Sequence, residues 1–188
     1  AHYYVNRARA KQACNDQTSQ DDFKRALAID PDRSLTKYNM TVQAKENSFE
    51  QTEKQLTEII QNDTTLQYPY VARGYYRLSN GNLKGALADY DRALKIDDHD
   101  PQLWLNRGLT KEKLQDYIGA FSDYTRAIEL KENFANAWLN RGNLLMKQSR
   151  FEDAIEDYSI AILHQPNYGY AYLNRALSKH YQKLPGAC

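Results

Sequence analysis

Small and aromatic residues recur along the chain at intervals of 34 residues. Residues 67–100, 101–134 and 135–168 align without gaps, and each segment has an aromatic residue four positions before a glycine. The glycine and tyrosine columns of this alignment contain Gly74, Gly108, Gly142, Tyr90, Tyr124 and Tyr158. A fixed internal period of this length predicts repeated supersecondary units that stack on one another.

Within each unit the core positions have helical spacing. Trp104, Gly108 and Lys111 stand at i, i+4 and i+7, which places them on one face of a helix, and a second helix repeats this spacing around Tyr124. A glycine at the helix crossing lets two backbones approach, and the tyrosine ring fills the space beside it. Lys111 and its counterpart Arg77 share this face, so we expect their stems to pack and their charges to point outside.

Turn and capping residues mark the ends of these helices. Asp100 followed by Pro101 predicts a helix N-cap before a first-turn proline. Turns between the two helices of a unit are predicted at Asn80-Gly81, Gln115-Asp116 and Ser149-Arg150. Each unit is therefore expected to be a helix–turn–helix pair.

The pattern continues on both sides of the three aligned segments. Residues 4–8 mirror residues 104–108, and residues 172–176 open a further unit. Residues 34–66 lack the glycine and alanine columns but keep helical apolar spacing around Leu56, so we interpret them as a degenerate repeat. We predict one array over residues 1–188, with repeats at approximately 1–33, 34–66, 67–100, 101–134, 135–168 and, in part, 169–188.

The spacing of aromatic, glycine, alanine and tyrosine residues resembles the tetratricopeptide repeat (TPR), W-x2-L-G-x2-Y followed by A-x3-F, A and P. The final proline is present as Pro166 and replaced by Asp98 and Glu132 in the earlier units. The resemblance implies an all-α solenoid of about five and a half repeats, wound as a right-handed superhelix, that binds other proteins in a concave groove. Residues 185–188 are similar to a segment of bacterial TPR proteins, which favours a bacterial source.

In the TPR family the first helices line the groove, and the position two residues after the leading aromatic faces the ligand. Here that position holds Asn6, Asn106, Asn140 and Asn174, with Ala72 interrupting the series. An asparagine amide both donates and accepts hydrogen bonds, so the series can bind a peptide backbone whatever the peptide's side chains are. A similar asparagine ladder lines the TPR domain of the O-linked GlcNAc transferase. The alternative is that asparagine is simply tolerated on a solvated face. Further groove residues are expected at Leu105, Leu109, Leu139, Asn143, Leu173, Leu177 and Tyr75.

Two other columns refine this prediction. Chaperone-binding TPR domains grip a terminal carboxylate with lysines, but the corresponding positions four residues before each asparagine hold Gln102, Asn136 and Tyr170. A general peptide or protein ligand is therefore favoured over a chaperone tail. The repeated arginine follows the groove position by about 100° of helix rotation, which favours pairing with acidic residues of neighbouring helices. The arginines are Arg7, Arg73, Arg107, Arg141 and Arg175, and the acidic residues Asp89, Asp123 and Asp157.

Composition narrows the function classes further. Lys and Arg number 25 against 24 Asp and Glu, so the formal net charge of +1 favours neither nucleic acid nor an anionic membrane as a partner. No catalytic, phosphate-binding or metal-binding motif is present, and residues 97–100 are better explained by capping than by a metal, so we predict neither enzyme activity nor a cofactor. Cys14 and Cys188 are expected to be free thiols, which favours the cytoplasm; a periplasmic protein with a removed signal peptide is the alternative.

Two alternative roles stay open. The last helix carries an apolar face that needs cover, formed by Tyr170, Tyr172, Leu173, Leu177 and Tyr181. This helix either caps the array or packs on another subunit. In the second case the chain would be a self-associating module or homo-oligomer. The second alternative is that the chain is a regulatory TPR segment of a longer multidomain protein.

Overall fold

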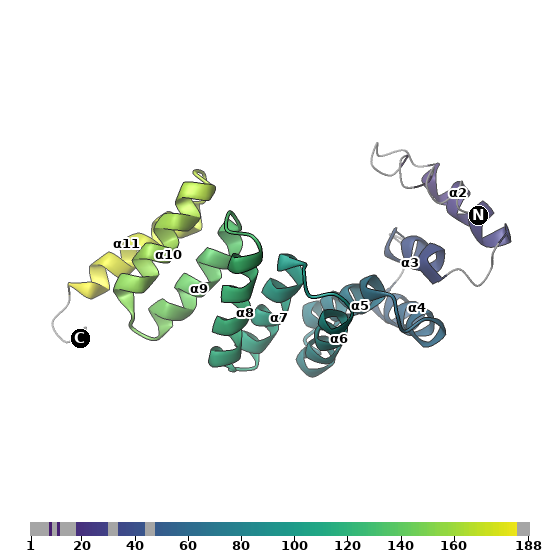
Figure 1. Ribbon diagram of the computed structural model, residues 1–188, viewed down its shortest axis with the longest axis horizontal. Coiled ribbons are helices and arrows are strands. Elements are labelled where there is room, and N and C mark those ends of the chain that lie inside the picture. Colours follow the sequence, from purple (N-terminus) through teal and green to yellow (C-terminus); the bar gives the residue numbers. More distant parts are fainter. Residues whose placement is uncertain (1–7, 9–10, 12–17, 30–33, 44–47, 184–188) are drawn as a thin grey trace. The chain divides into compact units, whose positions relative to one another are not determined.

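A computed structural model describes residues 18–29, 34–43 and 48–183, together with Ala8 and Lys11. Every helix or strand among these residues is an α-helix (Figure 1). The chain forms two compact units, Ala1–Ile96 and Asp97–Cys188. Predictions that concern Asn6, Arg7, the two cysteines and residues 185–188 lie outside the described residues. The all-helical fold class is confirmed.

The first unit contains five described helices. They are α2 (Ser19–Ile29), α3 (Ser34–Gln43), α4 (Phe49–Asn62), α5 (Gln67–Ser79) and α6 (Leu83–Ile96). Consecutive helices pack against each other, most extensively α5 against α6. Helix α4 begins with a capping box in which Ser48 Oγ accepts from Gln51 N, and it buries Leu56, Ile59 and Ile60. The segment interpreted as a degenerate repeat is thus a helix pair, α3 and α4.

The second unit continues the same alternation. It contains α7 (Pro101–Lys113), α8 (Tyr117–Leu130), α9 (Ala135–Lys147), α10 (Phe151–His164) and α11 (Gly169–Gln182). Asp100 is the N-cap of α7, where its Oδ1 accepts from Gln102 N at 2.9 Å and Pro101 occupies the first turn. This cap is as the sequence predicts.

In each of the three regular repeats, the turn between the two helices contains one residue in the left-handed conformation. Gly81 has φ 80°, Gln115 has φ 65° and Ser149 has φ 60°, all at the same place in the 34-residue period. Only the first is a glycine, so the other two carry the roughly 1 kcal/mol that a side chain costs in this conformation. The three predicted turns are confirmed.

A glycine of the first helix lies on a tyrosine ring of the second in each of the three regular repeats. Tyr90, Tyr124 and Tyr158 are fully buried. A Cβ added to Gly108 would lie 2.7 Å from Tyr124 Cε1, and one added to Gly74 or Gly142 would lie 2.8 Å from the corresponding ring atom. Since real Cβ contacts are longer, a larger side chain would displace the ring.

The arginine column is paired with buried aspartates, as predicted. The closest N–O distances are 2.6 Å for Arg73–Asp89, 2.7 Å for Arg107–Asp123 and 2.8 Å for Arg141–Asp157. The arginines also stack on the leading aromatics: the guanidinium carbon of Arg107 lies 4.6 Å from the centroid of the Trp104 ring. Arg175 has no aspartate counterpart among the described residues, and its Nη1 donates to Ser159 Oγ at 3.2 Å.

The expectation that Lys111 and Arg77 point their charges outside is wrong. Lys111 Nζ lies 2.9 Å from Asp123 Oδ2, and Arg77 Nη1 lies 2.9 Å from Asp89 Oδ2. Because these aspartates are almost fully desolvated, a second cation lowers the electrostatic cost of burying them. The repeat position of Arg77 and Lys111 therefore supplies the second cation of a buried ion cluster. In the next repeat Leu145 occupies this position.

Candidate partner-binding surface

Three of the four predicted ladder asparagines belong to the second unit. Asn106, Asn140 and Asn174 occupy the same position of α7, α9 and α11, and each is partly exposed. The first helices therefore present this column to solvent. Asn6 lies outside the described residues, and the intervening position of the first unit holds Ala72.

The three amides differ in how many of their hydrogen-bonding groups the fold uses. Asn106 Oδ1 accepts from Gln102 Nε2 at 2.9 Å, whereas Asn174 Nδ2 donates to Asn143 Oδ1 at 2.8 Å. The side chain of Asn140 forms no hydrogen bond with another described residue. Donors and acceptors of the column consequently remain open to a ligand, most completely at Asn140.

Asn143 has a structural role that its place in the sequence did not indicate. Its Oδ1 accepts from Tyr158 Oη at 2.9 Å as well as from Asn174. Burial raises the pKa of the Tyr158 hydroxyl, and the nearby Asp157 carboxylate raises it further, so this group stays a donor. The counterpart hydroxyl of Tyr124 donates to Glu112 Oε2 at 2.8 Å instead. Asn143 thus connects the core to the ladder, although it was predicted only as a groove residue.

Of the five predicted groove leucines, two are core residues. Leu105 is 3% exposed and Leu139 7% exposed, and both belong to core clusters with the second helices. Leu109 is partly buried against the first of these clusters. Leu173 is 56% exposed and Leu177 is 36% exposed, so these two leucines offer surface to a partner.

The difference between Leu139 and Leu173 has a direct cause. Both stand at the same position of the repeat, but Leu139 is packed in a cluster with residues of α10, and no described helix follows α11 to do the same for Leu173. Periodicity therefore identifies the face on which a residue lies, but not whether another helix covers it.

Tyr75 and the three positions that hold lysine in carboxylate-binding TPR domains remain to be located. Tyr75 is exposed on α5, in the first unit. At the positions where carboxylate-binding relatives have lysines, Gln102 is bonded to Asn106, the Oδ1 of Asn136 accepts from Tyr168 Oη at 2.6 Å, and Tyr170 is exposed. These three positions bring no positive charge to the column.

One group of possible metal ligands lies at the beginning of the second unit. Ligand atoms of Asp97, Asp98 and His99 lie within 4.8 Å of one another, and all three residues border solvent. His99 Nδ1 is 2.9 Å from Asp97 Oδ1, and the hydrogen bond from the His99 backbone lowers the pKa of Asp97. Three ligands of this kind fall short of the six to eight oxygens that calcium takes.

None of the described helices combines the length and apolarity needed to cross a membrane. No curated protein sequence matches the chain.

Several solved structures with similar folds are TPR proteins. YrrB, a TPR protein with an unusual peptide-binding site, has a TM-score of 0.74 at 19% identity, covering 88% of this chain and 86% of its own. A tetratricopeptide repeat protein from Parabacteroides merdae gives 0.73 at 18%, covering 95% and 72%. The second TPR domain of human RPAP3, in complex with the HSP70 peptide SGPTIEEVD, gives 0.56 at 25%, covering 58% and 92%.

Family models match the three regular repeats in succession. A model described as TPR repeat matches residues 74–115, and models described as tetratricopeptide repeat match residues 101–134 and 135–168. The matched segments contain all three Gly–Tyr crossings and two of the Arg–Asp pairs, Arg107–Asp123 and Arg141–Asp157. The chain therefore belongs to the tetratricopeptide-repeat proteins.

Proposed function

We propose that the chain is a protein–protein interaction scaffold, and that a peptide or helix of a partner binds along α7, α9 and α11 across Asn106, Asn140 and Asn174. The observation that carries the proposal is the repeated, partly exposed amide whose hydrogen-bonding groups the fold leaves partly unused. Because successive repeats present the same group, the column suits a ligand that is itself regular, such as a peptide backbone.

Proteins with similar folds bind peptides, which supports a peptide as the ligand of this chain. YrrB has a peptide-binding site, and the RPAP3 domain binds a chaperone peptide. A ligand held by its terminal carboxylate would need fixed cations, and Gln102, Asn136 and Tyr170 supply none. The proposed ligand is therefore an internal segment of a partner, held through its backbone by the amides and through apolar side chains at Leu173 and Leu177.

A pull-down from a lysate of the source organism tests this proposal. The wild-type chain is compared with an Asn106/Asn140/Asn174→Ala variant, after circular dichroism has established equal helicity. A partner retained by the wild type and lost by the variant supports a ligand on the asparagine column. Retention of the same partner by both proteins contradicts it.

A matched control separates the column from the rest of the surface. Ser122 and Ile118 are exposed residues of α8, and Ile118 is 86% exposed. A Ser122/Ile118→Ala variant should retain the partner as the wild type does. Loss of the partner in this control would place the interaction on the second helices instead.

Self-association is a second candidate, favoured by the exposed face of α11. Tyr170, Tyr172, Leu173 and Tyr181 are all exposed there, and a face of this kind is a candidate contact for a second copy. Sedimentation velocity over a hundredfold concentration range tests this role. A dimer that Leu173→Lys dissociates would support it, and a concentration-independent monomer would exclude it. A regulatory segment within a longer protein is compatible with either candidate.

A further inference from the structure

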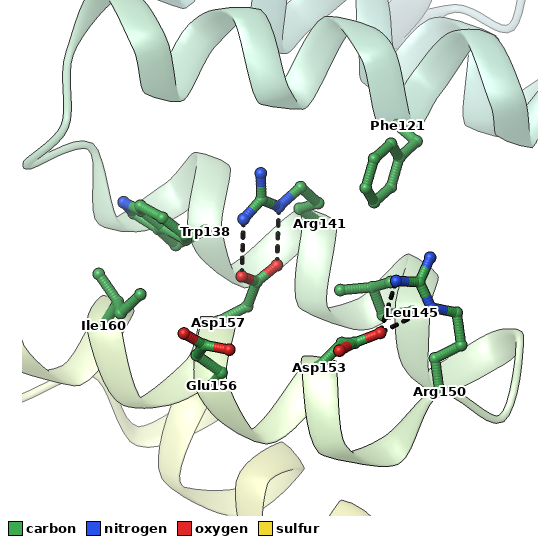
Figure 2. Close-up of a pocket in the computed structure, with 9 residues that line it drawn as sticks. All are labelled: Phe121, Trp138, Arg141, Leu145, Arg150, Asp153, Glu156, Asp157 and Ile160. Carbon is green, nitrogen blue, oxygen red and sulfur yellow. Dashed lines mark hydrogen bonds and ion pairs between the residues drawn. The ribbon is translucent and has the colours of Figure 1, made fainter.

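A second candidate site, separate from the asparagine column, is a pocket between α8, α9 and α10. Its volume is about 270 Å³, and it shares no residue with the column. Figure 2 shows the Arg141–Asp157 pair across its middle, with Trp138 and Ile160 to one side and Phe121 on the neighbouring helix. The remaining lining residues are Leu145, Arg150, Asp153 and Glu156.

The pocket lies where the third regular repeat lacks a cation that the two preceding repeats have. Asp89 is paired with both Arg73 and Arg77, and Asp123 with both Arg107 and Lys111. Asp157 is paired with Arg141, and the position of the second cation is occupied by Leu145. The buried carboxylate of this repeat is therefore less completely compensated than its two counterparts.

The other charged groups of the pocket do not correct this imbalance. Arg150 is bonded to Asp153, with Nε 2.7 Å from Oδ2, and Glu156 forms no ion pair with a described residue. Three carboxylates thus face two guanidinium groups. Burial, together with the neighbouring Glu156 and Asp153 carboxylates, raises the pKa of Asp157 in spite of the opposing effect of Arg141. The pocket is a site of negative potential with aromatic and aliphatic walls.

We infer that this pocket binds a lysine or arginine side chain of a partner protein. The aliphatic stem lies against Trp138, Ile160 and Phe121, and the cationic group pairs with Glu156 and reaches the carboxylate of Asp157. The two preceding repeats supply this cation from within the chain, once as arginine and once as lysine, which indicates that both head groups suit the position. Anionic ligands such as phosphate are disfavoured by the excess of carboxylates.

The two tryptophans of the chain provide a direct readout. Trp138 lines the pocket and Trp104 does not, yet both indole groups donate to a backbone carbonyl at 2.7 Å, to Glu132 and Asp98 respectively. Two-dimensional ¹⁵N NMR resolves their indole signals, so Trp104 serves as an internal control. The probe is the peptide acetyl-Gly-Lys-Gly-amide, and the matched control peptide carries norleucine, which has the stem without the charge.

The lysine peptide should shift the Trp138 signal saturably and leave Trp104 unchanged, while the norleucine peptide should have no comparable effect. Equal responses to both peptides, equal responses of both tryptophans, or no response of Trp138 would overturn the inference.

Two variants test the roles of the pocket residues. Leu145→Lys places a cation of the chain where Lys111 stands in the preceding repeat, and Glu156→Gln removes an exposed carboxylate without changing shape. Each should weaken binding of the lysine peptide at least about tenfold. Circular dichroism verifies folding, and Glu156→Gln keeps the test decisive if Leu145→Lys does not fold. Unchanged binding to the folded Glu156→Gln protein would contradict the proposed site.

Discussion

The helix pairs α7–α8 and α9–α10 have the same backbone design but compensate their buried carboxylates differently. In both, a glycine lies on a buried tyrosine ring, a non-glycine residue adopts the left-handed conformation in the turn, and an arginine pairs with an aspartate. In the first pair Lys111 adds a second cation to Asp123. In the second pair Leu145 replaces it, and a pocket lies beside Asp157.

This difference separates residues that the fold requires from residues that it leaves open to change. Glycine and tyrosine at the crossing cannot vary independently, because a Cβ on Gly142 would lie 2.8 Å from Tyr158. The second cation can be lost, because Arg141 still satisfies both oxygens of Asp157. Positions at which one repeat departs from its neighbours in this way are therefore candidate binding positions.

The largest effect is expected from removing the arginine of each pair. Arg141→Ala leaves Asp157 buried without a cation and should cost about 3 kcal/mol of unfolding free energy. Arg107→Ala should cost roughly half as much, because Lys111 still pairs with Asp123. Urea denaturation of the two variants measures the difference. Equal losses would contradict the unequal compensation of the two aspartates.

The loss in Arg141→Ala should also depend on pH. The pKa of Asp157 is raised above 3.8 in the folded protein, and removal of Arg141 raises it further. A buried carboxyl with a raised pKa destabilises the fold only at pH values where it is ionised. The loss of unfolding free energy that comes from the Asp157 charge is therefore complete above the pKa of Asp157 in the folded protein, and it disappears as the pH falls below 3.8. Denaturation at a series of pH values checks this, and a loss that grows toward acid pH would refute it.

The next largest effect is expected at the helix crossing. Gly142→Val drives a branched side chain into the Tyr158 ring and should cost about 2 kcal/mol. Gly169→Val is the matched control, because nothing lies within 4 Å of a Cβ at that position, and it should change stability by less than about 1 kcal/mol. Thermal unfolding followed by circular dichroism compares the two variants. Similar losses would show that the crossing is not the cause.

A smaller effect is expected from making the two repeats alike. Leu145→Lys removes the packing of a buried leucine, and the new ion pair with Asp157 offsets part of this loss, so the free energy of unfolding should fall by about 1.5 kcal/mol. In the Arg141→Ala background the same substitution should recover at least about 1 kcal/mol, because it restores a cation. A double-mutant cycle measures this coupling, and purely additive effects would exclude the expected pair.

The smallest effect on stability is expected at the ladder. Asn140→Ala should change the unfolding free energy by less than about 0.5 kcal/mol, since the side chain has no bonded partner among the described residues. Asn143→Ala should cost about 1 kcal/mol, because Tyr158 and Asn174 each lose an acceptor. Chemical denaturation distinguishes them, and a large loss in Asn140→Ala would assign that residue to folding.

Much of the fold followed from the sequence because its determinants are local and periodic. The helix pairs, the three left-handed turns, the Gly–Tyr crossings and the Arg–Asp pairs all depend on residues at fixed spacing. Four features did not follow: the inward charges of Lys111 and Arg77, the burial of Leu105 and Leu139, the two bonds of Asn143, and the pocket beside Asp157. Each depends on which neighbouring helix covers a given face, and spacing within one helix does not determine that.

The most direct test of the proposed function is site-specific photocrosslinking in the source cells, with a benzoylphenylalanine at position 140 and, as the control, at position 118. Both positions accept a large side chain on the surface, because Asn140 is partly exposed and Ile118 is 86% exposed. The account predicts a covalent adduct with a partner protein from position 140 that is absent from position 118. An adduct from position 118 alone would contradict it.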